Sequence, residues 1–482
     1  MAVISETGIV YDDARKLHEE CGVAAVFLSE QGEAELLEQG VSARDIVYWA
    51  LAAQIHRGQQ NTGLAVTTDG HNFDVIRGKG PVASAFEDGA RLDELPASGR
   101  IAIGHNRYTT SGGPLGAQPT KLLSNRGDIV LAHNGNFSNH LDLPEGTRGE
   151  QPSDTWLFTS GVADEMDAGY TLPSALIRMA KIAEGAFSIV AGAEGQLVAM
   201  RDPRGMRPLS LGRLGTYGWM LTSETGALDA VGATYERGIK RGELLTIDDR
   251  GPNSIQYASR EDHRSAFCAM EDIYLARPDH LNVREERISA GRILFEEAPL
   301  DVDLIVPILD SGREYAQGYA EASGIAYAEA IGKVANERAF MASGDRQMVV
   351  SGKHLIDPAL IKDKRIVIID DSIVRGDTLT VLTQGLMDAG ANEVHIVIGS
   401  PPIEWPCFYG VDFPESNKLA MHESSVGRLK ERFQANSLHY LSMSGLERAF
   451  GAGRCTACFT GDYPTDIAPI HPSRSLQITP VS

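Results

Sequence analysis

Basic residues are scarce in this chain: 44 Lys and Arg stand against 65 Asp and Glu in 482 residues, a formal net charge of −21. Nonspecific binding to nucleic acid or to anionic membranes needs a basic surface, so neither is expected as a partner. No apolar run approaches the roughly 18 residues that span a bilayer. The first twenty residues lack the basic-then-apolar order of a secretory signal. We therefore expect a cytoplasmic protein.

Cysteine is also rare, with five in the whole chain. Cys21 stands alone near the N-terminus, and the other four, in the second half, are Cys268, Cys407, Cys455 and Cys458. In a reducing cytoplasm cysteines are more often catalytic or metal-bound than disulfide-bonded. One nucleophile and four thiolate ligands would account for all five, which suggests acyl transfer and a metal centre. Taken alone, a cysteine on an apolar strand is more often a buried core thiol. The Cys-x-x-Cys pair alone fits a redox pair, half a zinc site or iron–sulfur ligands equally well.

The pattern of elements changes near residue 270, and the length allows two or three domains. Before that point, short β-rich runs alternate with turns and helical stretches, which is typical of a layered α+β fold. After it, continuous apolar runs alternate with helices, as buried parallel strands do. The expected strands are residues 22–28, 62–67, 100–104, 128–133 and 187–191 in the first part, and 303–309, 324–328, 365–369 and 393–399 in the second.

Polar clusters stand at predicted strand ends, where sites are usually built, at residues 56–60, 104–110 and 132–136. With Cys21 they resemble the glutamine amidotransferases of the N-terminal-nucleophile class. In that class a cysteine becomes residue one after processing, and its α-amine serves as the general base. A free α-amine has a pKa of about 8, so it can accept the thiol proton, which a peptide nitrogen cannot do. The resemblance implies removal of residues 1–20.

The same resemblance implies roles for four residues around Cys21. Asn134 and Gly135 resemble the oxyanion hole, where one donor typically contributes about 3 kcal/mol. Arg107 would bind the glutamine α-carboxylate, because a planar guanidinium matches a carboxylate in bidentate fashion. Asp154 would hold the glutamine α-ammonium. Taken singly, such charged residues could equally be solvated surface charges.

Arg57 and Tyr108 would shape and close the glutamine pocket in this resemblance. Trp156 departs from the family pattern, which usually has a glutamate at this position. The inner wall of the pocket therefore differs from that of relatives.

Residues 369–378, Ile-Asp-Asp-Ser-Ile-Val-Arg-Gly-Asp-Thr, form the most specific single motif. It resembles the phosphoribosyl pyrophosphate signature of type I phosphoribosyltransferases, although an apolar strand with an acidic helix cap is the alternative. Adjacent acids would hold the ribose hydroxyls and help organise Mg²⁺, and a loop at a helix N-terminus would hold the 5-phosphate. The implied ligand-binding residues are Asp370, Asp371, Ser372, Arg375, Gly376, Asp377 and Thr378, with Ser311, Asp370 and Asp371 at Mg²⁺.

Three further segments of the second half of the chain bear on this resemblance, one as a match and two as departures. Residues 310–313 resemble the pyrophosphate loop. Asp377 stands where the family more often has Thr, and since a carboxylate repels phosphate, we expect it to face away or cap the helix. The loop that covers the substrate and completes the ammonia channel in relatives keeps only fragments of its basic and aromatic pattern here, at Lys333, Asn336, Arg338 and Phe340.

The sequence around the last cysteines, at residues 401–410, 438–442 and 455–464, resembles the C-terminal half of the glutamine phosphoribosylpyrophosphate amidotransferase family. The similar branch carries a propeptide and a [4Fe–4S] cluster, and Cys268, Cys407, Cys455 and Cys458 match its ligands. For that cluster the resemblance implies a structural and oxygen-sensing role. It also implies a homotetramer inhibited by purine nucleotides.

The resemblance predicts a propeptide at 1–20, a four-layer αββα N-terminal-nucleophile hydrolase domain at 21–260, an α/β type I phosphoribosyltransferase domain with the cluster-binding segment at 271–468, and a tail at 469–482. Cys21 would hydrolyse glutamine, and ammonia would pass internally to phosphoribosyl pyrophosphate, giving phosphoribosylamine, glutamate and pyrophosphate in the first step of purine synthesis. Two alternatives stay open. One is a diverged enzyme of a specialised pathway with an altered phosphoribosyl site, and the other is a non-enzymatic protein that senses nucleotides and oxygen.

Overall fold

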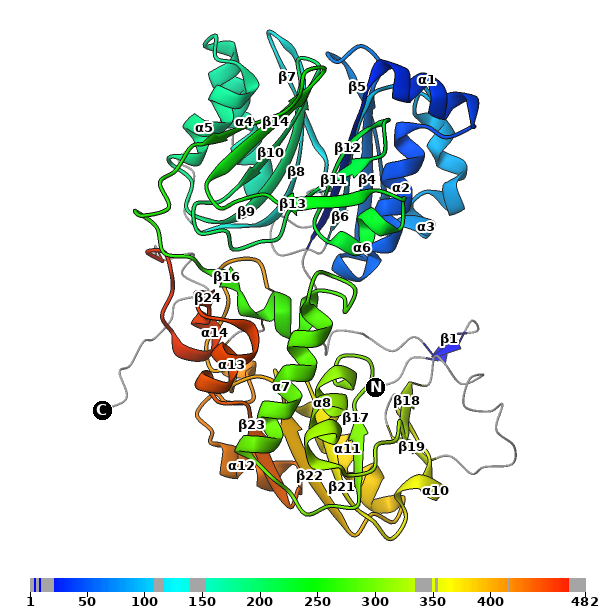
Figure 1. Cartoon of the computed structure of the whole chain (residues 1–482), viewed down its shortest axis with the longest axis vertical. Helices are drawn as coiled ribbons and strands as arrows, with labels where there is room; N and C mark the ends of the chain where they lie inside the picture. The colour runs from blue at the N-terminus through cyan, green and yellow to red at the C-terminus, as the bar shows by residue number, and fades with distance from the viewer. Residues whose placement is uncertain are drawn as a thin grey trace.

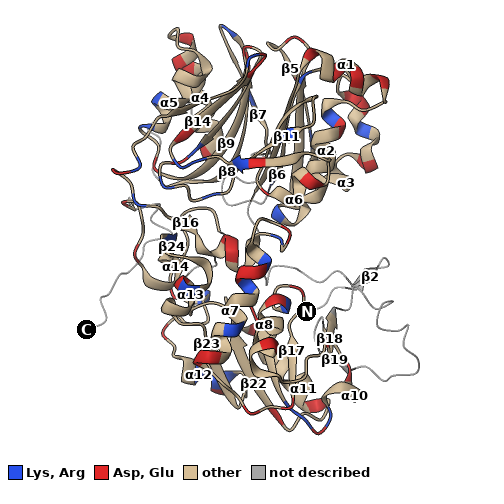
Figure 2. Ribbon diagram, in the orientation of Figure 1, with Lys and Arg blue, Asp and Glu red and all other residues tan. Residues whose placement is uncertain are grey.

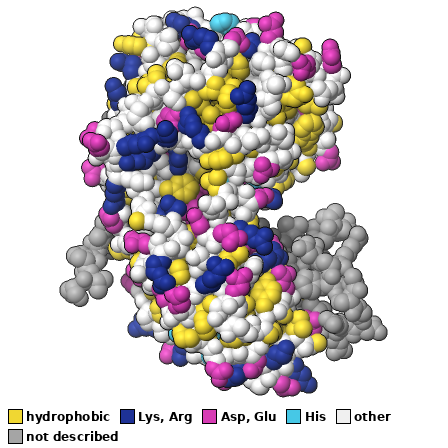
Figure 3. All heavy atoms as spheres, viewed as in Figure 1, with side chains coloured by type: hydrophobic (Ala, Val, Ile, Leu, Met, Phe, Trp, Pro, Cys, Tyr) yellow, Lys and Arg dark blue, Asp and Glu magenta, His cyan; other side chains and the backbone are white. Residues whose placement is uncertain are grey.

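The computed structural model describes residues 21–107, 117–138, 153–333, 349–351, 354–411, 413 and 416–467, and, nearer the N-terminus, the short strands β1 (Ile4–Ser5) and β2 (Gly8–Ile9). Figure 1 shows two lobes, the first built around two sheets and the second around one parallel sheet. Acidic and basic side chains are interspersed over both lobes (Figures 2 and 3). Within the described residues, no helix combines the length and apolarity that crossing a membrane requires.

The first lobe contains two antiparallel sheets that face one another (Figure 1). The six-stranded sheet runs β15 (Gly251–Gln256), β14 (Glu243–Asp248), β10 (Gln196–Arg201), β9 (Gly185–Ala193), β8 (Gly127–Phe137), β7 (Thr120–Ser124). The seven-stranded sheet runs β13 (Thr234–Gly238), β11 (Ser210–Leu214), β12 (Gly218–Thr222), β3 (Gly22–Leu28), β6 (Ile101–Arg107), β4 (Asn61–Thr67), β5 (Phe73–Lys79).

Helices cover both outer faces of this sandwich and complete four αββα layers. Strand β3 shows the arrangement: Val23, Ala25 and Phe27 enter the core between the sheets, while Ala24 and Val26 enter the core beneath the helices. Because both faces are buried, the strand is apolar throughout. The outer helical elements are α1 (Glu30–Glu38), α2 (Ala43–Ala53), η1 (Ile55–Arg57), α3 (Val82–Ala85), η2 (Glu87–Glu94) and α6 (Thr225–Asp229) on one side, and α4 (Asp154–Asp167) and α5 (Leu172–Ala180) on the other.

The second lobe is an α/β layer structure around a parallel sheet. Its strands run in the order β17 (Leu304–Pro307), β21 (Arg365–Asp370), β22 (Glu393–Ile398), β23 (Ser437–Tyr440). Alternate strand residues such as Val367 and Ile368 enter different cores, one under each layer of helices. One layer holds α7 (Val283–Glu297), α8 (Arg313–Ser323) and α13 (Met443–Phe450), and the other holds α10 (Pro358–Ile361), α11 (Asp377–Asp388) and α12 (Val426–Arg432).

One expected strand is wrong. Residues 324–328 make only an isolated bridge, between Tyr327 and Ile305 of β17. Most of this segment is exposed, so no buried apolar face holds it in an extended ladder.

The junction between the lobes brings the end of the chain back to its middle. Strand β16 (Phe267–Cys268) pairs in parallel with β24 (Arg454–Cys455), and the one-turn helix η4 (Glu271–Leu275) and α14 (Ala457–Thr460) lie beside them (Figure 1). A small sheet, β18 (Ile331–Lys333), β20 (His354–Ile356), β19 (Val349–Ser351), and the turn η6 (Ser416–Lys418) complete the described elements.

Candidate functional site

Cys21 immediately precedes β3 and is buried. The antiparallel register pairs Gly22 with Asn106, so Cys21 comes beside Arg107 at the end of β6. On the backbone side, Nε of Arg57 donates a hydrogen bond of 3.2 Å to the Cys21 carbonyl oxygen. The candidate nucleophile is therefore held at a strand end, between two arginines.

Arg107 interacts electrostatically with both Cys21 and Asp154. Burial lowers the pKa of the Arg107 guanidinium, and the nearby Cys21 and Asp154 oppose that effect. Asp154 opens α4, whose start is fixed by Ser153: the Ser153 hydroxyl oxygen accepts a 3.2 Å hydrogen bond from the Trp156 N–H. Three residues predicted from separate parts of the sequence thus meet in one place.

Asn134 lies on β8 and is fully buried. Neither its side-chain oxygen nor its nitrogen has a hydrogen-bond partner among the described residues. A buried polar group left unpaired costs about 1–3 kcal/mol, so its presence suggests a ligand that completes the bonding. Gly135 follows with φ +137°, and a Cβ there would lie 2.0 Å from the Ala186 carbonyl oxygen. Only glycine fits this backbone.

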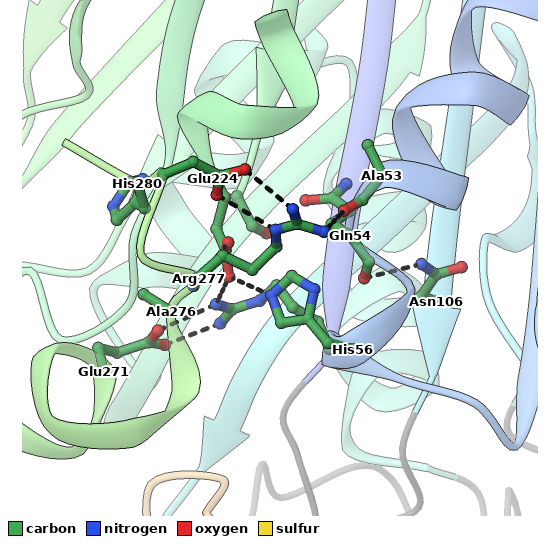
Figure 4. Close-up of polar contacts among 12 residues, drawn as sticks. Ala53, Gln54, His56, Asn106, Glu224, Glu271, Ala276, Arg277 and His280 are labelled. Carbon is green, nitrogen blue, oxygen red and sulfur yellow. Dashed lines mark hydrogen bonds and ion pairs between the residues drawn. The ribbon is translucent and has the colours of Figure 1, made fainter. Parts of the chain in front are cut away.

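Arg57 is buried in an ion-pair network rather than exposed in an open pocket. Its guanidinium contacts Glu224 at 2.6 Å and Glu271 at 2.8 Å, and Figure 4 shows these two glutamates with His56 and Arg277. Trp156 is half-buried on α4. Tyr108, residues 10–20 of the leader, and Asn336, Arg338 and Phe340 of the covering loop lie outside the described residues, as does the side chain of Lys333.

The second lobe contains a cavity of about 590 Å³ at the carboxyl ends of β17 and β21. Its loops place the Ser311 hydroxyl 3.5 Å from Oδ1 of Asp370, to which it donates. Gly376, at φ +79°, precedes the N-terminus of α11. Every residue predicted for the phosphoribosyl site borders this cavity: Ser311, Asp370, Asp371, Ser372, Arg375, Gly376, Asp377 and Thr378.

Asp377 forms an ion pair with Arg432 of α12, with 2.7 Å between Oδ1 and Nη2. The pair neutralises the carboxylate that would otherwise repel a phosphate. This pairing, which the sequence did not indicate, offers a physical reason why an acid can stand in the loop.

The four remaining cysteines, Cys268, Cys407, Cys455 and Cys458, all border one small cavity at the lobe junction. The register of β16 and β24 pairs Cys268 with Cys455. Burial raises the pKa of Cys455 to about 11, and raises that of Cys458 well above its ordinary value, with neighbouring cysteines adding to both. All five cysteines are described, and none forms a disulfide.

Within the described residues, no group of three or more His, Cys, Asp or Glu is arranged to hold a single metal ion. A four-iron cluster differs in its demands, because each cysteine binds a different iron and the sulfurs stand further apart. Four thiols around one cavity fit that donor set.

Comparison with known proteins decides the family. Residues 286–399 match the model of the phosphoribosyl transferase domain. The amidophosphoribosyltransferase of Bacillus subtilis is 36% identical over 94% of this chain and 96% of its own length, and that of Synechocystis is 36% identical over 94% and 92%. The chain belongs to the amidophosphoribosyltransferase family. Among solved structures, the glutamine phosphoribosylpyrophosphate amidotransferase of B. subtilis, complexed with ADP and GMP, matches with a TM-score of 0.81 and 34% identity, over 93% of this chain and 98% of that one. The expected fold class is confirmed.

The structure also brings residues to the phosphoribosyl cavity that the sequence did not indicate. His56 of the first lobe and Arg277 both border the phosphoribosyl cavity. Glu314, the second residue of α8, borders it too, and its buried Oε2 has no hydrogen-bond partner among the described residues. In the sequence, His56 begins the polar cluster at residues 56–60, and Glu314 directly follows the loop at residues 310–313.

Proposed function

We infer that the chain transfers the amide nitrogen of glutamine to phosphoribosyl pyrophosphate, giving 5-phosphoribosylamine, glutamate and pyrophosphate, the first step of de novo purine biosynthesis. Family membership over nearly the whole chain supports this activity. The observation that carries it here is that Arg107 interacts with both Cys21 and Asp154, while the buried amide of Asn134 has no hydrogen-bond partner among the described residues.

In the first half-reaction, we propose that removal of residues 1–20 frees the α-amine of Cys21. That amine takes the thiol proton, and the sulfur attacks the glutamine carboxamide. Asn134 Nδ2 and the Gly135 N–H stabilise the tetrahedral oxyanion. The amine returns the proton to the leaving ammonia, and water then hydrolyses the thioester to glutamate.

In the glutaminase site, each charged group of glutamine is bound by a side chain of opposite charge. Arg107 binds the glutamine α-carboxylate, and Asp154 holds the α-ammonium. Tyr108 closes the pocket, and Arg57 shapes it from its buried position. The proposed domain limits are 1–20 for the propeptide, 21–260 for the glutaminase, 271–468 for the transferase and 469–482 for the tail.

In the second half-reaction, the backbone of the loop at Arg375, Gly376 and Thr378 receives the 5-phosphate at the N-terminus of α11. Asp370 and Asp371 hold the ribose hydroxyls, and Ser372 borders them. Ammonia attacks C1 as the bond to pyrophosphate breaks. Ser311, Asp370 and Asp371 offer the oxygen ligands that Mg²⁺ prefers, and the ion would neutralise the leaving pyrophosphate.

We further propose that Cys268, Cys407, Cys455 and Cys458 hold a [4Fe–4S] cluster that stabilises the lobe junction and reports oxygen. Their position around one cavity supports this donor set. Anaerobically purified protein should be brown and contain about four irons per chain. A colourless protein that contains zinc would overturn the assignment.

A cytoplasmic homotetramer inhibited by purine nucleotides completes the proposal. The B. subtilis structure is complexed with ADP and GMP, which supports nucleotide binding in the family. Equilibrium dialysis with each nucleotide, and sedimentation of the purified chain, test the two points separately.

A diverged enzyme with an altered phosphoribosyl site is the second candidate. Glu314 and Asp377, two carboxylates that border the cavity, favour it. Assays with glutamine and phosphoribosyl pyrophosphate separate the two: phosphoribosylamine supports the first proposal, whereas glutamate without phosphoribosylamine supports the second.

A further inference from the structure

Arg57 binds the backbone of the candidate nucleophile and two buried carboxylates at the same time. Its Nε donates to the Cys21 carbonyl oxygen at 3.2 Å. Its two Nη atoms donate to Glu271, at 3.0 and 2.8 Å, and Nη1 also donates to Glu224 at 2.6 Å. Because the two glutamates fix both Nη atoms of the planar guanidinium, its Nε–H can point only toward the Cys21 carbonyl oxygen.

The two carboxylates come from different lobes. Glu224 immediately precedes α6 of the first lobe, whereas Glu271 opens η4, at the start of the second. Each is about 1% exposed. The site of the nucleophile in the first lobe therefore draws one of its supports from the second lobe.

The network sets opposite charges against one another, as a buried group of this size requires. Arg207 is fully buried and contacts Glu271 at 3.4 Å, while its Nη2 donates to the Tyr409 carbonyl oxygen at 2.6 Å. Two arginines thus face two glutamates. Removing one carboxylate leaves an excess of buried positive charge, which moves or reorients Arg57.

Glu224 also connects this network to the wall of the phosphoribosyl cavity. Its Oε1 contacts His56 Nε2 at 2.8 Å, and its Oε2 accepts from the Arg277 backbone N–H at 3.2 Å. His56 and Arg277 both border that cavity, and Figure 4 shows them near the two glutamates.

We propose that Glu271 and Glu224 are positioning residues for glutamine hydrolysis: one from each lobe, they clamp Arg57 onto the Cys21 carbonyl and so orient the amine and the thiol of that residue. The glutaminase site is incomplete without the carboxylate of the second lobe. This inference rests on the proposed role of Cys21 as nucleophile.

The test is Glu271→Gln, which keeps the shape and removes the charge. We expect the glutamine-dependent kcat to fall at least about tenfold, equivalent to about 1.4 kcal/mol, with the KM for glutamine within about twofold. The rate at which 6-diazo-5-oxonorleucine labels Cys21 should fall in parallel. Phosphoribosylamine formation from ammonia should stay within about twofold, which also shows that the second lobe is folded.

Glu224→Gln gives a second route to the same prediction if Glu271→Gln does not fold. Glu243→Gln is the control, because Glu243 is also buried in the first lobe and pairs with an arginine, Arg237, at 2.7 Å. It should leave both reactions and the labelling rate unchanged. Glu271→Asp, which retains the carboxylate, should recover part of the lost kcat.

Three outcomes overturn the inference: an unchanged kcat in Glu271→Gln, a change in the KM for glutamine alone, or an equal loss of the glutamine and ammonia reactions. The second would assign Arg57 to glutamine binding, and the third would make the network merely structural. Wild-type protein that forms phosphoribosylamine from ammonia but not from glutamine would instead refute the proposed function of Cys21.

Discussion

The side-chain amide of Asn134 is enclosed by protein and has no hydrogen-bond partner among the described residues. Asn106, on the adjacent sheet, is equally buried, but its Nδ2 donates to the carbonyl oxygens of Leu51 and Gln54 at 2.8 and 3.2 Å. The asparagine side chain at position 106 therefore stabilises the fold, whereas the one at position 134 is available to bind a ligand. Buried residues that stabilise nothing are candidates for function.

Asn134→Ala should lower the glutamine-dependent kcat by about 100- to 1,000-fold, because an oxyanion donor is lost. The free energy of unfolding should change little, since the Asn134 side chain makes no hydrogen bond among the described residues. Steady-state kinetics and chemical denaturation measure the two effects. Asn106→Ala is the control, with a loss of stability of about 1–3 kcal/mol. Unaltered glutamine turnover in Asn134→Ala would exclude the oxyanion role.

The charge of Glu224 should make the free energy of unfolding depend on pH. Burial opposes its ionisation, but His56 and Arg57 prevail and hold the pKa of Glu224 well below its ordinary value. Its stabilisation is therefore complete above the unfolded pKa of about 4.3, and is lost as the pH falls through the folded pKa. Glu224→Gln should cost about 3 kcal/mol at neutral pH.

The stability difference between the wild type and Glu224→Gln should shrink as the pH falls below about 4.3. Denaturant titrations between about pH 7 and about pH 3 measure it. A difference that stays constant over this range would show that the carboxylate is not stabilised by its charge.

Among the elements, the loop between β21 and α11 contains a constrained backbone position of the second lobe's site. Gly376 has φ +79°, and a Cβ there would lie 2.7 Å from Cζ of Phe433. The motif identified this loop in the sequence because strand, acids, glycine and helix follow one another without interruption. By contrast, residues 324–328 were expected to form a strand only because they are apolar, and they form a single isolated β-bridge.

Gly376→Ala should raise the KM for phosphoribosyl pyrophosphate about 5- to 30-fold, since the left-handed conformation costs about 1–2 kcal/mol in alanine. Labelling of Cys21 by 6-diazo-5-oxonorleucine should continue at the wild-type rate. Gly324→Ala is the matched control, because Gly324 has φ +71° with open space around it. That variant should lose stability but keep the KM. Equal KM values in Gly376→Ala and wild type would place the phosphate elsewhere.

For the whole molecule, the sequence predicted two lobes of different architecture, and the structure confirms both. Local patterns are enough to predict the two architectures, because the strands of each lobe have a recognisable sequence. Strand β3 is a buried strand of the first lobe, and β21 is a buried parallel strand of the second. Cys21, Arg107 and Asp154 were predicted from resemblance, since no local pattern places residues 133 positions apart, 21 and 154, side by side.

Contacts between the lobes could not be predicted in this way. Glu271 follows Cys268 in an apolar stretch, and nothing nearby in sequence indicates that Arg57 pairs with it from 214 positions away. His56, likewise, borders a cavity that belongs to the other lobe. These residues depend on how two separately folded cores dock, which is a property of the assembled chain.

Ammonia is the only reactant that we expect to pass from the glutaminase reaction to the transferase reaction. The most direct measurement is phosphoribosylamine formation by Cys21→Ser, supplied in turn with glutamine and with ammonium salt. Glutamine-dependent formation should be abolished, while ammonia-dependent formation should continue at about the wild-type rate, because the transferase cavity does not contain Cys21. Full activity with glutamine, or loss of the ammonia reaction as well, would contradict it.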